Sequence, residues 1–279
     1  MEKHPYCILC HASNLRKIYQ KDKWRYLRCI NCDLVSLYPR PSTEVLIDSY
    51  QAYLPLKPDE ISKWASMMEP VIVKSADLIE TRLSPLKGKL LDIGCGYGFF
   101  LNRMKSRGWQ VEGIEISGPG RRYAMDKWNI HVYEQAIEHL CIPENSFDVV
   151  TLFYVIEHVH DPPELLKEVR RILKPGGLLL LRWPHSTPII KILGPLSKKL
   201  DLYHTPYHLY DFSPRSINKL LNLTGFKEIM TMIGGYTHPS KRTDRLVSIL
   251  SGRLAETLYR VSGGKVLLPG ISKTTLACK

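Results

Sequence analysis

The sequence predicts an α/β protein with a doubly wound parallel sheet, preceded by a small N-terminal unit. Three observations lead to this fold class. Strand and helix patterns alternate from Lys89 to Trp183, a glycine-rich turn follows the first of these strands, and two C-x-x-C pairs lie within the first forty residues. Strands that alternate with helices form parallel crossover units. We expect residues 1–40 to form the small unit, 41–83 a linker and a helix, and 84–279 the main domain.

The small unit is predicted to be a zinc ribbon. Cys7 and Cys10 form one C-x-x-C pair, 18 residues follow, and Cys29 and Cys32 form the second pair. This spacing is typical of zinc sites, and four thiolates leave the ion no open position, so the zinc would be structural. A metal-free remnant and a pair of disulfides are the alternatives. The pattern of "KWRYLRC" predicts one short strand before the second pair.

A cytosolic location is expected, because the N-terminus lacks an apolar secretory signal and no window approaches the roughly 18 apolar residues of a membrane span. Cysteines stay reduced in the cytosol, which favours metal binding over disulfides. The other three cysteines, Cys95, Cys141 and Cys278, have no partner at metal spacing and are expected to be packing residues.

The main domain is expected to run through eight elements up to Trp183. Asp161 is predicted to cap the third helix, with Pro162 in its first turn, and "KPGG" to stop that helix before the next strand. The expected strands are 89–94, 110–116, 130–134, 147–153 and 177–183, and the expected helices are 98–108, 118–129 and 162–174.

Beyond Trp183 the pattern becomes less regular. Residues 184–212 are rich in aromatic residues, prolines and histidines without a clear period, and are expected to form an insertion that acts as a lid over the sheet. A capped helix at 213–226, a strand at 227–233, an amphipathic helix at 244–261 and a short strand at 274–278 are expected to follow.

The turn "DIGCGYGFF" indicates a nucleotide-type ligand. It lies between a strand and a helix, as a nucleotide-binding turn requires. Its spacing is G-x-G-x-G, however, whereas dinucleotide folds use G-x-G-x-x-G, and Phe99 stands where their third glycine would be. Asp92 in front of the turn would repel a phosphate and would suit a ligand that carries a positive charge.

With these residues the sequence resembles the class I S-adenosylmethionine-dependent methyltransferases, whose signature is an acidic residue followed by G-x-G-x-G after the first strand. "QAIEHLCIPENSFDVV", "LFYVIEHVHDP" and "RRILKPGGLLLL" resemble further stretches of that family. The resemblance implies a Rossmann-like sheet of seven strands and S-adenosylmethionine as cofactor. Glu115, 21 residues after Gly94, would accept hydrogen bonds from the ribose hydroxyls. The implied cofactor-binding residues are Asp92, Gly94, Cys95, Gly96, Gly98, Glu115, Ile116, Ala136, Ile137 and Phe153.

Histidines are the candidates for a catalytic base. A methyl group leaves a sulfonium easily, so alignment dominates catalysis and a base is needed only if the acceptor must lose a proton. His158 follows the fourth strand at the carboxyl edge of the sheet and is the first candidate; His208 is the second, ahead of His185 and His204. "EHV" also resembles ubiquinone-pathway O-methyltransferases, in which a Glu three residues earlier helps to hold a divalent cation. Tyr154 stands there, so that metal is not carried over.

The favoured function is methyl transfer to a small molecule, on the oxygen of a sugar, a polyketide-like or a lipid-quinone metabolite. The net charge of +12 lies mainly in the two ends of the chain, which indicates an anionic partner. An RNA methyltransferase with a basic zinc ribbon is the first alternative, and a non-catalytic zinc-ribbon scaffold the second. "IIKILGPLSKKL" could contact a membrane surface. No DNA contact is expected, and the sequence predicts neither the acceptor nor the oligomeric state.

Overall fold

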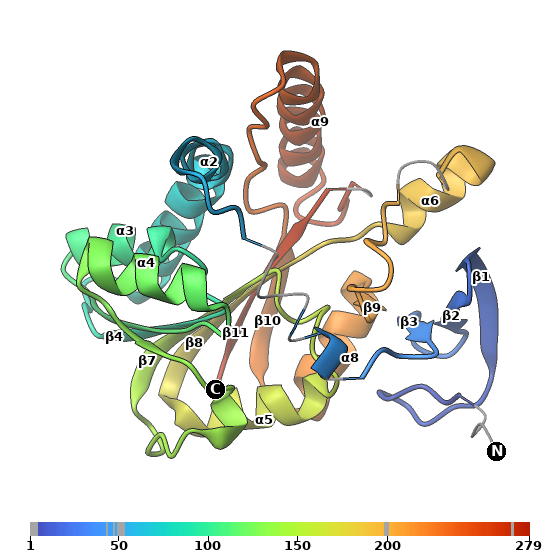
Figure 1. The fold of residues 1–279 in the computed structure, drawn as a ribbon. Helices are drawn as coiled ribbons and strands as arrows, with labels where there is room; N and C mark the ends of the chain where they lie inside the picture. Colours follow the sequence, from blue (N-terminus) through green and yellow to red (C-terminus); the bar gives the residue numbers. More distant parts are fainter. Residues whose placement is uncertain (1–4, 43, 47, 49–53, 198–200, 269–270) are drawn as a thin grey trace.

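A computed structural model describes residues 5–42, 44–46, 48, 54–197, 201–268 and 271–279 (Figure 1). Within these residues the chain forms a seven-stranded sheet with helices on both faces and a smaller four-stranded sheet to one side. The predicted α/β class and the seven-stranded sheet are confirmed. No described helix is both long enough and apolar enough to pass through a bilayer.

The large sheet has the strand order β10-β11-β8-β7-β4-β5-β6. The strands from β8 to β6 run parallel, while β11 is antiparallel to both β8 and β10. The neighbours of β4 are β5 on one side and β7 on the other, so the carboxyl ends of these strands flank a crevice. The strands are β4 (Lys89–Ile93), β5 (Gln110–Ile114), β6 (His131–Tyr133), β7 (Phe147–Phe153), β8 (Leu173–Trp183), β10 (Lys227–Met232) and β11 (Lys273–Cys278).

Strand β8 shows why both faces of the sheet are covered. Successive side chains of a strand point to opposite faces. Leu178 and Leu180 accordingly pack in the hydrophobic cluster that includes α2, α3 and α4, whereas Leu179 and Leu181 pack in the cluster that includes α5 and α8. The helices are α2 (Pro58–Leu83), α3 (Phe99–Ser106), α4 (Gly118–Trp128), α5 (Pro162–Ile172) and α8 (Pro214–Leu223), with the short 3-10 turn η1 (Ile137–His139) before β7.

The helix ends follow the expected local chemistry, with one difference. The carboxylate of Asp161 accepts a hydrogen bond from the backbone N–H of Glu164 at 3.0 Å, which confirms it as the N-cap of α5. The segment "KPGG" does not form a separate loop before the strand. Helix α5 ends at Ile172 and β8 begins at Leu173, and the pairing with β7 shifts between Phe147 and Val149, so the segment is a bulge within the strand.

The small sheet combines the N-terminus with the insertion. Strands β1 (Leu15–Lys21), β2 (Trp24–Cys29) and β3 (Val35–Tyr38) form a meander, more regular than the single strand expected, and β9 (Tyr210–Asp211) pairs with β3. The insertion at 184–212 therefore does more than cover the large sheet: after α6 (Thr187–Leu193) and the turn η2 (Gly194–Leu196) it completes the small one.

Helix α9 (Arg242–Val261) stands apart from these layers and projects from the body, as α6 does (Figure 1). Its buried residues are small, Gly252 and Ala255. A Cβ at Gly252 would lie 2.1 Å from Cδ1 of Tyr236, so the glycine lets this ring pack directly on the helix backbone. The division of the chain at residues 40 and 83 stays a prediction. Tyr26 of the small sheet and Phe147 of the large sheet belong to one hydrophobic cluster, so the two sheets share a core.

Candidate functional site

The glycine turn joins β4 to α3 and has almost no room for side chains. Gly94 has a φ of +73°, and a Cβ there would lie 2.5 Å from Cγ2 of Val155. Gly98 has a φ of +72°, and a Cβ there would lie 2.9 Å from Cβ of Ala124. Both positions therefore require glycine. The result is a bare backbone surface at the carboxyl end of β4, where a ligand can approach closely.

Glu115 closes the turn from the neighbouring strand. Its carboxylate accepts one hydrogen bond from the N–H of Gly96 and one from the N–H of Ser117, both at 2.7 Å. Burial raises the pKa of Glu115, while these two N–H donors and the charge of Arg121 act in the opposite direction. Each carboxylate oxygen has a second lone pair, so the side chain can still accept from a ligand hydroxyl.

Asp92 lies beneath the turn, fully enclosed by protein. Thr151 of β7 donates a hydrogen bond to its Oδ1 at 2.7 Å. Burial, assisted by the negative charge of Glu115, raises the pKa of Asp92 to about 8, although the Thr151 hydrogen bond lowers it. Two buried carboxyl groups close to one another make this end of the site attractive to a positively charged ligand.

A cavity of about 530 Å³ extends from this turn, a size typical of small-molecule sites. Of the residues predicted to bind the cofactor, seven line it: Asp92, Gly94, Cys95, Gly96, Glu115, Ile116 and Phe153. Gly98, Ala136 and Ile137 do not line it. Gly98 supports the turn from behind, Ile137 is buried in the core, and Ala136 precedes η1. The binding roles of these ten residues stay predictions.

The opposite wall carries a group of titratable side chains that come from distant parts of the chain. Glu157 and His158 follow β7, and His204 and His208 come from the insertion; all four line the cavity. One possible ligand atom from each of Glu157, His158 and His208 lies within 4.8 Å of the others. The rings of His158 and His208 have centroids 4.7 Å apart. His185 does not line the cavity, so the structure separates it from the other three histidine candidates.

Glu157 is the unusual member of this group. Its side chain is fully buried, and neither carboxylate oxygen has a hydrogen-bond partner among the described residues. Burial raises the pKa of Glu157 to about 8. A buried carboxyl group without a partner is costly, and such groups are found where a ligand or ion completes them.

The two histidines of the cluster are neutral at physiological pH. Burial lowers the pKa of His158 to about 4 and holds the pKa of His208 well below its usual range. Nδ1 of His158 lies 3.0 Å from the carbonyl oxygen of Tyr207. A carbonyl only accepts, so Nδ1 carries the proton of the neutral ring and Nε2 carries its lone pair.

The family model described as "Methyltransferase domain" matches residues 68–230 of this chain, a span that contains the glycine turn, Glu115, Glu157 and the three histidines that line the cavity. The chain belongs to this methyltransferase family. The resemblance seen in the glycine turn and its neighbours is thereby confirmed: the chain is a member of the methyltransferase family and has the fold of S-adenosylmethionine-dependent methyltransferases.

Curated relatives of this methyltransferase match less than half of its length. The ubiquinone biosynthesis O-methyltransferase of Aeromonas salmonicida is 34% identical over 128 residues, which is 42% of this chain and 54% of that protein. The enzyme of the same name from Idiomarina loihiensis is 36% identical over 110 residues, 36% of this chain and 44% of that protein. The chain thus spans about half the length of the curated relatives it matches.

Solved structures of two methyltransferases share the fold. A possible histamine N-methyltransferase from Thermotoga maritima superimposes with a TM-score of 0.52 at 19% identity, covering 79% of this chain and 95% of that chain. An S-adenosylmethionine-dependent methyltransferase from Archaeoglobus fulgidus gives 0.52 at 21% identity, covering 75% and 93%. At such identities the likeness concerns the fold alone.

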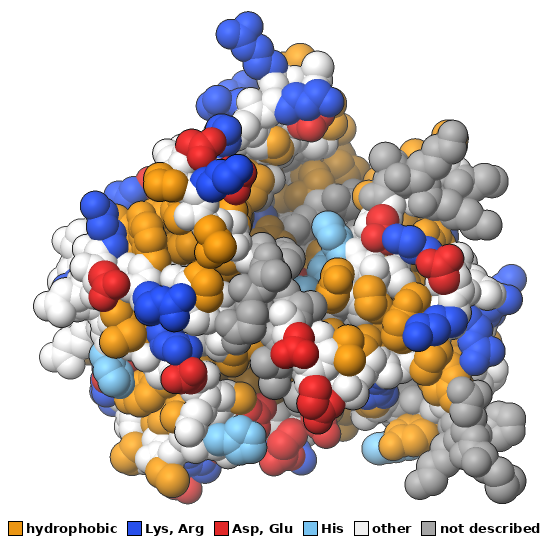
Figure 2. All heavy atoms as spheres, viewed as in Figure 1, with side chains coloured by type: hydrophobic (Ala, Val, Ile, Leu, Met, Phe, Trp, Pro, Cys, Tyr) orange, Lys and Arg blue, Asp and Glu red, His pale blue; other side chains and the backbone are white. Residues whose placement is uncertain are grey.

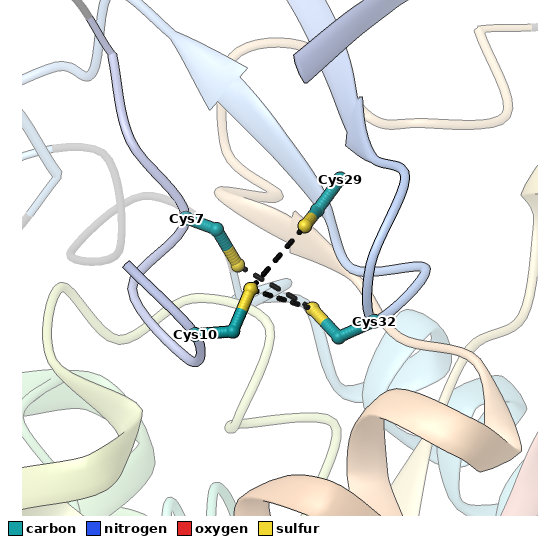
Figure 3. Close-up of side chains that lie close together, drawn as sticks. All are labelled: Cys7, Cys10, Cys29 and Cys32. Carbon is teal, nitrogen blue, oxygen red and sulfur yellow. Dashed lines mark hydrogen bonds between the residues drawn. The ribbon is translucent and has the colours of Figure 1, made fainter. Parts of the chain in front are cut away.

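The methyltransferase also gathers its four N-terminal cysteines (Figure 3). The sulfur of Cys7 lies 3.4 Å from that of Cys32, and the sulfur of Cys10 lies 3.4 Å from Cys29 and 3.8 Å from Cys32. A zinc ion with four sulfurs at about 2.3 Å needs sulfurs about 3.8 Å apart. The donor set therefore fits a zinc ion, and the two knuckles converge as predicted.

The remaining cysteines behave differently from one another. Cys95 is buried in the glycine turn, and burial holds its pKa well above the usual range, so it is an unreactive packing residue. Cys278 is half-buried. Cys141 is exposed, and the prediction that it packs in the interior is wrong, because the segment after η1 runs along the surface.

The sequence pattern does not reveal two parts of the site. Helix α2 contributes Trp64, Met67 and Met68 to the cavity, whereas the sequence predicts only a linker and a helix in this region. The sequence indicates Glu157 only as half of the Glu-His pair in "EHV". The available signal is its position, since a carboxylate directly after the apolar run "FYVI" must lie at the carboxyl edge of a buried strand.

Tyr154 explains why this chain departs from the related Glu-x-x-Glu-His pattern. Its hydroxyl accepts a hydrogen bond from Nε of the buried Arg182 at 2.9 Å, and its φ is +56°. Tyr154 thus hydrogen-bonds to an arginine in β8. The third possible metal ligand beside Glu157 and His158 is instead His208 from the insertion.

Proposed function

We propose that this methyltransferase transfers the methyl group of S-adenosylmethionine to an oxygen of a small-molecule acceptor, of the hydroxylated, quinone-like aromatic class. The observation that carries the proposal is the continuous cavity between the glycine turn and the cluster of Glu157, His158 and His208. The turn suits a cationic adenosyl ligand, and the cluster suits a hydroxyl group that must lose a proton. The names of the related O-methyltransferases support the same acceptor class.

The donor end of the cavity fits S-adenosylmethionine by its shape and charge. The backbone at Gly96 leaves space for the ligand, since a Cβ there would meet only Cδ1 of Leu54 at 4.0 Å, and Glu115 offers acceptors for its ribose hydroxyls. Asp92, whose pKa burial raises, becomes easier to ionise beside a positive sulfonium. When bound, this cofactor supplies a methyl group on an excellent leaving group.

The protein's own contribution at the acceptor end is to align the acceptor and to receive its proton. In neutral His158 the lone pair of Nε2 can accept the proton of an acceptor hydroxyl, while the Tyr207 carbonyl fixes the ring. The apolar side chains that line the cavity exclude water and offer a surface for an aromatic ring: Trp64, Met67, Met68 and Phe153. Alignment of this kind can contribute about 7 kcal/mol or more to lowering the barrier.

Glu157 and His158, with His204 and His208, form the acceptor wall of the cavity. Three of these residues, Glu157, His158 and His208, also suit a divalent cation as ligands. The orphaned carboxylate of Glu157 supplies the negative charge, and His158 and His208 supply two neutral nitrogens. Such an ion would occupy Nε2 of His158, so this nitrogen would no longer accept the proton. The ion would instead lower the pKa of a bound acceptor hydroxyl, which would release its proton to solvent. We propose these three residues as its ligands, and the four cysteines as ligands of a separate, structural zinc ion in a protein that works in a reducing compartment such as the cytosol.

The alternatives are not favoured. An RNA methyltransferase would need a base-sized acceptor site open to a polynucleotide, whereas here Glu157 is fully buried, His158 and His208 are half-buried, and the cavity is lined mainly by apolar side chains. A non-catalytic scaffold leaves the buried, unpartnered carboxylate of Glu157 without a purpose. The chain's membership of the methyltransferase family argues against this second alternative.

The test is methyl transfer from labelled S-adenosylmethionine to defined acceptors. Catechols that carry a prenyl chain should be labelled at least about tenfold faster than sugars with free hydroxyls, and total RNA should remain unlabelled. Substitution His158→Ala should reduce labelling about 100-fold, as loss of a general base does, while cofactor affinity stays unchanged. Labelling of RNA in preference to every phenol would overturn the proposal.

A further inference from the structure

Helix α9 carries an apolar stripe that no part of the described chain covers. Its exposed members are Leu246, Val247, Leu250, Leu254, Leu258 and Val261, with 67% of Val247 and 58% of Leu250 accessible to solvent. At about 100° per residue these six side chains fall within an arc of about 120°. The helix packs on the body through the opposite side, at Gly252 and Ala255. The stripe is therefore a continuous face and not scattered surface leucines.

Arginines border this stripe. Arg242, Arg253 and Arg260 fall within about 40° of one edge of it by the same helical geometry. All three are exposed, and none of them forms an ion pair with another described residue. An apolar face edged by unpaired arginines is the pattern of a helix that lies in a membrane interface and meets anionic headgroups.

The base of α9 forms part of the cavity mouth. Thr237, just before the helix, lines the cavity, and its carbonyl accepts a hydrogen bond from Ser248 of α9 at 2.5 Å. The next residue, His238, donates its N–H to the carbonyl of Met67 at 2.9 Å, and Met67 lines the cavity from α2. The helix thus leaves the body directly beside the opening.

The second projection lies on the other side of that opening. Pro184 and Ser186 line the cavity and lead into α6, where Ile192 is exposed, as is Leu196 in the following turn. Figure 2 shows a hollow between the two projections, with histidine side chains at its floor and hydrophobic side chains on its flanks. Both projections point away from the sheet on the same side of the molecule (Figure 1).

We propose that α9 docks this methyltransferase on an anionic lipid surface, with the cavity mouth turned toward the lipid. The positive charge of the chain favours an anionic lipid surface over a second copy of the chain. A symmetric contact between two copies would bring the same arginines of two strongly basic chains together. The apolar stripe favours a lipid surface over RNA. RNA phosphates could contact the arginines, but RNA has no hydrocarbon region in which the leucines could be buried. For the route of the acceptor this inference rests on the proposed function, since a prenylated phenol dissolves in the bilayer.

Vesicle co-flotation of the purified full chain tests the docking. The vesicles contain phosphatidylcholine and phosphatidylglycerol at a ratio of about 7 to 3, and vesicles of phosphatidylcholine alone serve for comparison. We expect binding to the anionic vesicles and at least about fivefold weaker binding to the neutral ones. The double variant L250E/L254E should bind at least about tenfold more weakly than the native chain, because it places two charges in the apolar stripe.

The matched control is L223E, which adds the same charge at an exposed leucine at the end of α8 and should leave vesicle binding unchanged. Thermal melting and S-adenosylmethionine binding of L250E/L254E should equal those of the native chain, which separates loss of docking from loss of fold. The triple variant R242Q/R253Q/R260Q should bind anionic vesicles several-fold more weakly and lose most of its preference for them over neutral ones.

Three results would overturn the proposal: anionic vesicles that do not bind the native chain, equal binding by L250E/L254E, and a dimer in solution that L250E/L254E dissolves. RNA binding that falls in the arginine variant but survives in L250E/L254E would also count against it. The docking and the proposed function fail separately. A variant that methylates a soluble catechol normally but not a prenylated one in vesicles supports both, whereas vesicle binding without transfer to any phenol supports docking alone.

Discussion

The donor wall of the cavity comes from one short stretch of the chain, whereas the acceptor wall combines two stretches that lie far apart in the sequence. Asp92, the glycine turn and Glu115 lie within 24 residues of one another and follow two adjacent parallel strands. The acceptor wall combines Glu157 and His158, at the end of β7, with His204 and His208 from the insertion. One wall is fixed by local geometry, and the other depends on how distant segments pack.

The N-terminal unit holds the acceptor wall in place. The ring of Tyr26 stacks on Tyr203 with centroids 4.0 Å apart, and its hydroxyl donates to the carbonyl of His208 at 3.3 Å. Leu209, next in the chain, donates its N–H to the carbonyl of Glu157 at 2.8 Å, and its own carbonyl accepts from the N–H of Leu37 at 2.8 Å. The small sheet therefore supports the acceptor wall, which the sequence of that sheet alone does not reveal.

Loss of the zinc ion should have the largest effect on turnover. It should disturb the acceptor wall and leave the donor wall unchanged. Substitution Cys29→Ser, or removal of zinc, should unfold the small sheet, because binding energies for structural zinc are about 10 kcal/mol or more. Turnover should then fall by about 100-fold or more, since displacement of a positioned group by about 1 Å costs that factor. The affinity for S-adenosylmethionine, measured by calorimetry, should change by less than about threefold, because the donor wall makes no use of this sheet.

The matched control is Cys141→Ser, at an exposed cysteine outside the cluster, which should change neither quantity. Equal loss of cofactor affinity and turnover in Cys29→Ser would show that the two walls are not independent.

The same contrast explains how much of this molecule the sequence predicts. The order of strands and helices from Lys89 to Trp183 is predictable because each element carries its own period and its own caps, such as Asp161 at α5. The pairing of β9 with β3 is not predictable, since a strand of two residues has no detectable period. The segment 184–212, expected to form a lid alone, consequently also forms part of a second sheet.

The site follows the same division. The glycine turn and Glu115 can be placed from spacing alone, because backbone geometry after a parallel strand is stereotyped. Which of four histidines reach the cavity depends on tertiary packing, and no period in the sequence reports it. His158 and His208 do line it, but their action in catalysis stays a prediction.

The second prediction concerns the acceptor wall alone. Substitution Glu157→Gln should reduce turnover by about 100-fold if the carboxylate holds a cation, because a bound cation contributes about that factor or more. Cofactor affinity should stay the same, since Glu157 lies on the opposite wall. Steady-state kinetics and calorimetry on one preparation would measure both, with the exposed Glu144→Gln as the matched control.

A chelator tests whether Glu157 holds a cation. If Glu157, His158 and His208 hold a divalent cation, brief dialysis against a chelator should lower turnover of the native chain, and added Mg²⁺, Mn²⁺ or Zn²⁺ should restore it. The four-cysteine zinc must be shown by atomic absorption to remain. Added cation should not restore turnover in Glu157→Gln. Native turnover that is insensitive to the chelator would instead favour direct proton transfer to His158 without a cation.

The smallest predicted effect concerns Asp92 in the donor wall, measured through pH. Because burial raises the pKa of Asp92 to about 8, from about 3.9 in an unfolded chain, the folded protein binds one more proton than the unfolded chain between these values. Its contribution to stability is therefore full below about pH 4 and is lost as the pH rises toward 8. The variant Asp92→Asn has no ionisable group at this position and lacks this dependence. From about pH 5 to pH 7 the unfolding free energy of the native chain should fall by about 2.6 kcal/mol relative to that of the variant.

Denaturant titrations at about pH 5, 6 and 7 measure this difference, and all other titrating groups cancel between the two proteins. Saturating S-adenosylmethionine should flatten the difference, because its sulfonium favours the charged carboxyl that burial disfavours. A difference that is the same at every pH would mean that Asp92 is ionised in the ligand-free protein. A difference that S-adenosylmethionine leaves unchanged would mean that the carboxyl does not sense the cation, and the donor wall would then owe its selectivity to Glu115 and the backbone of the turn.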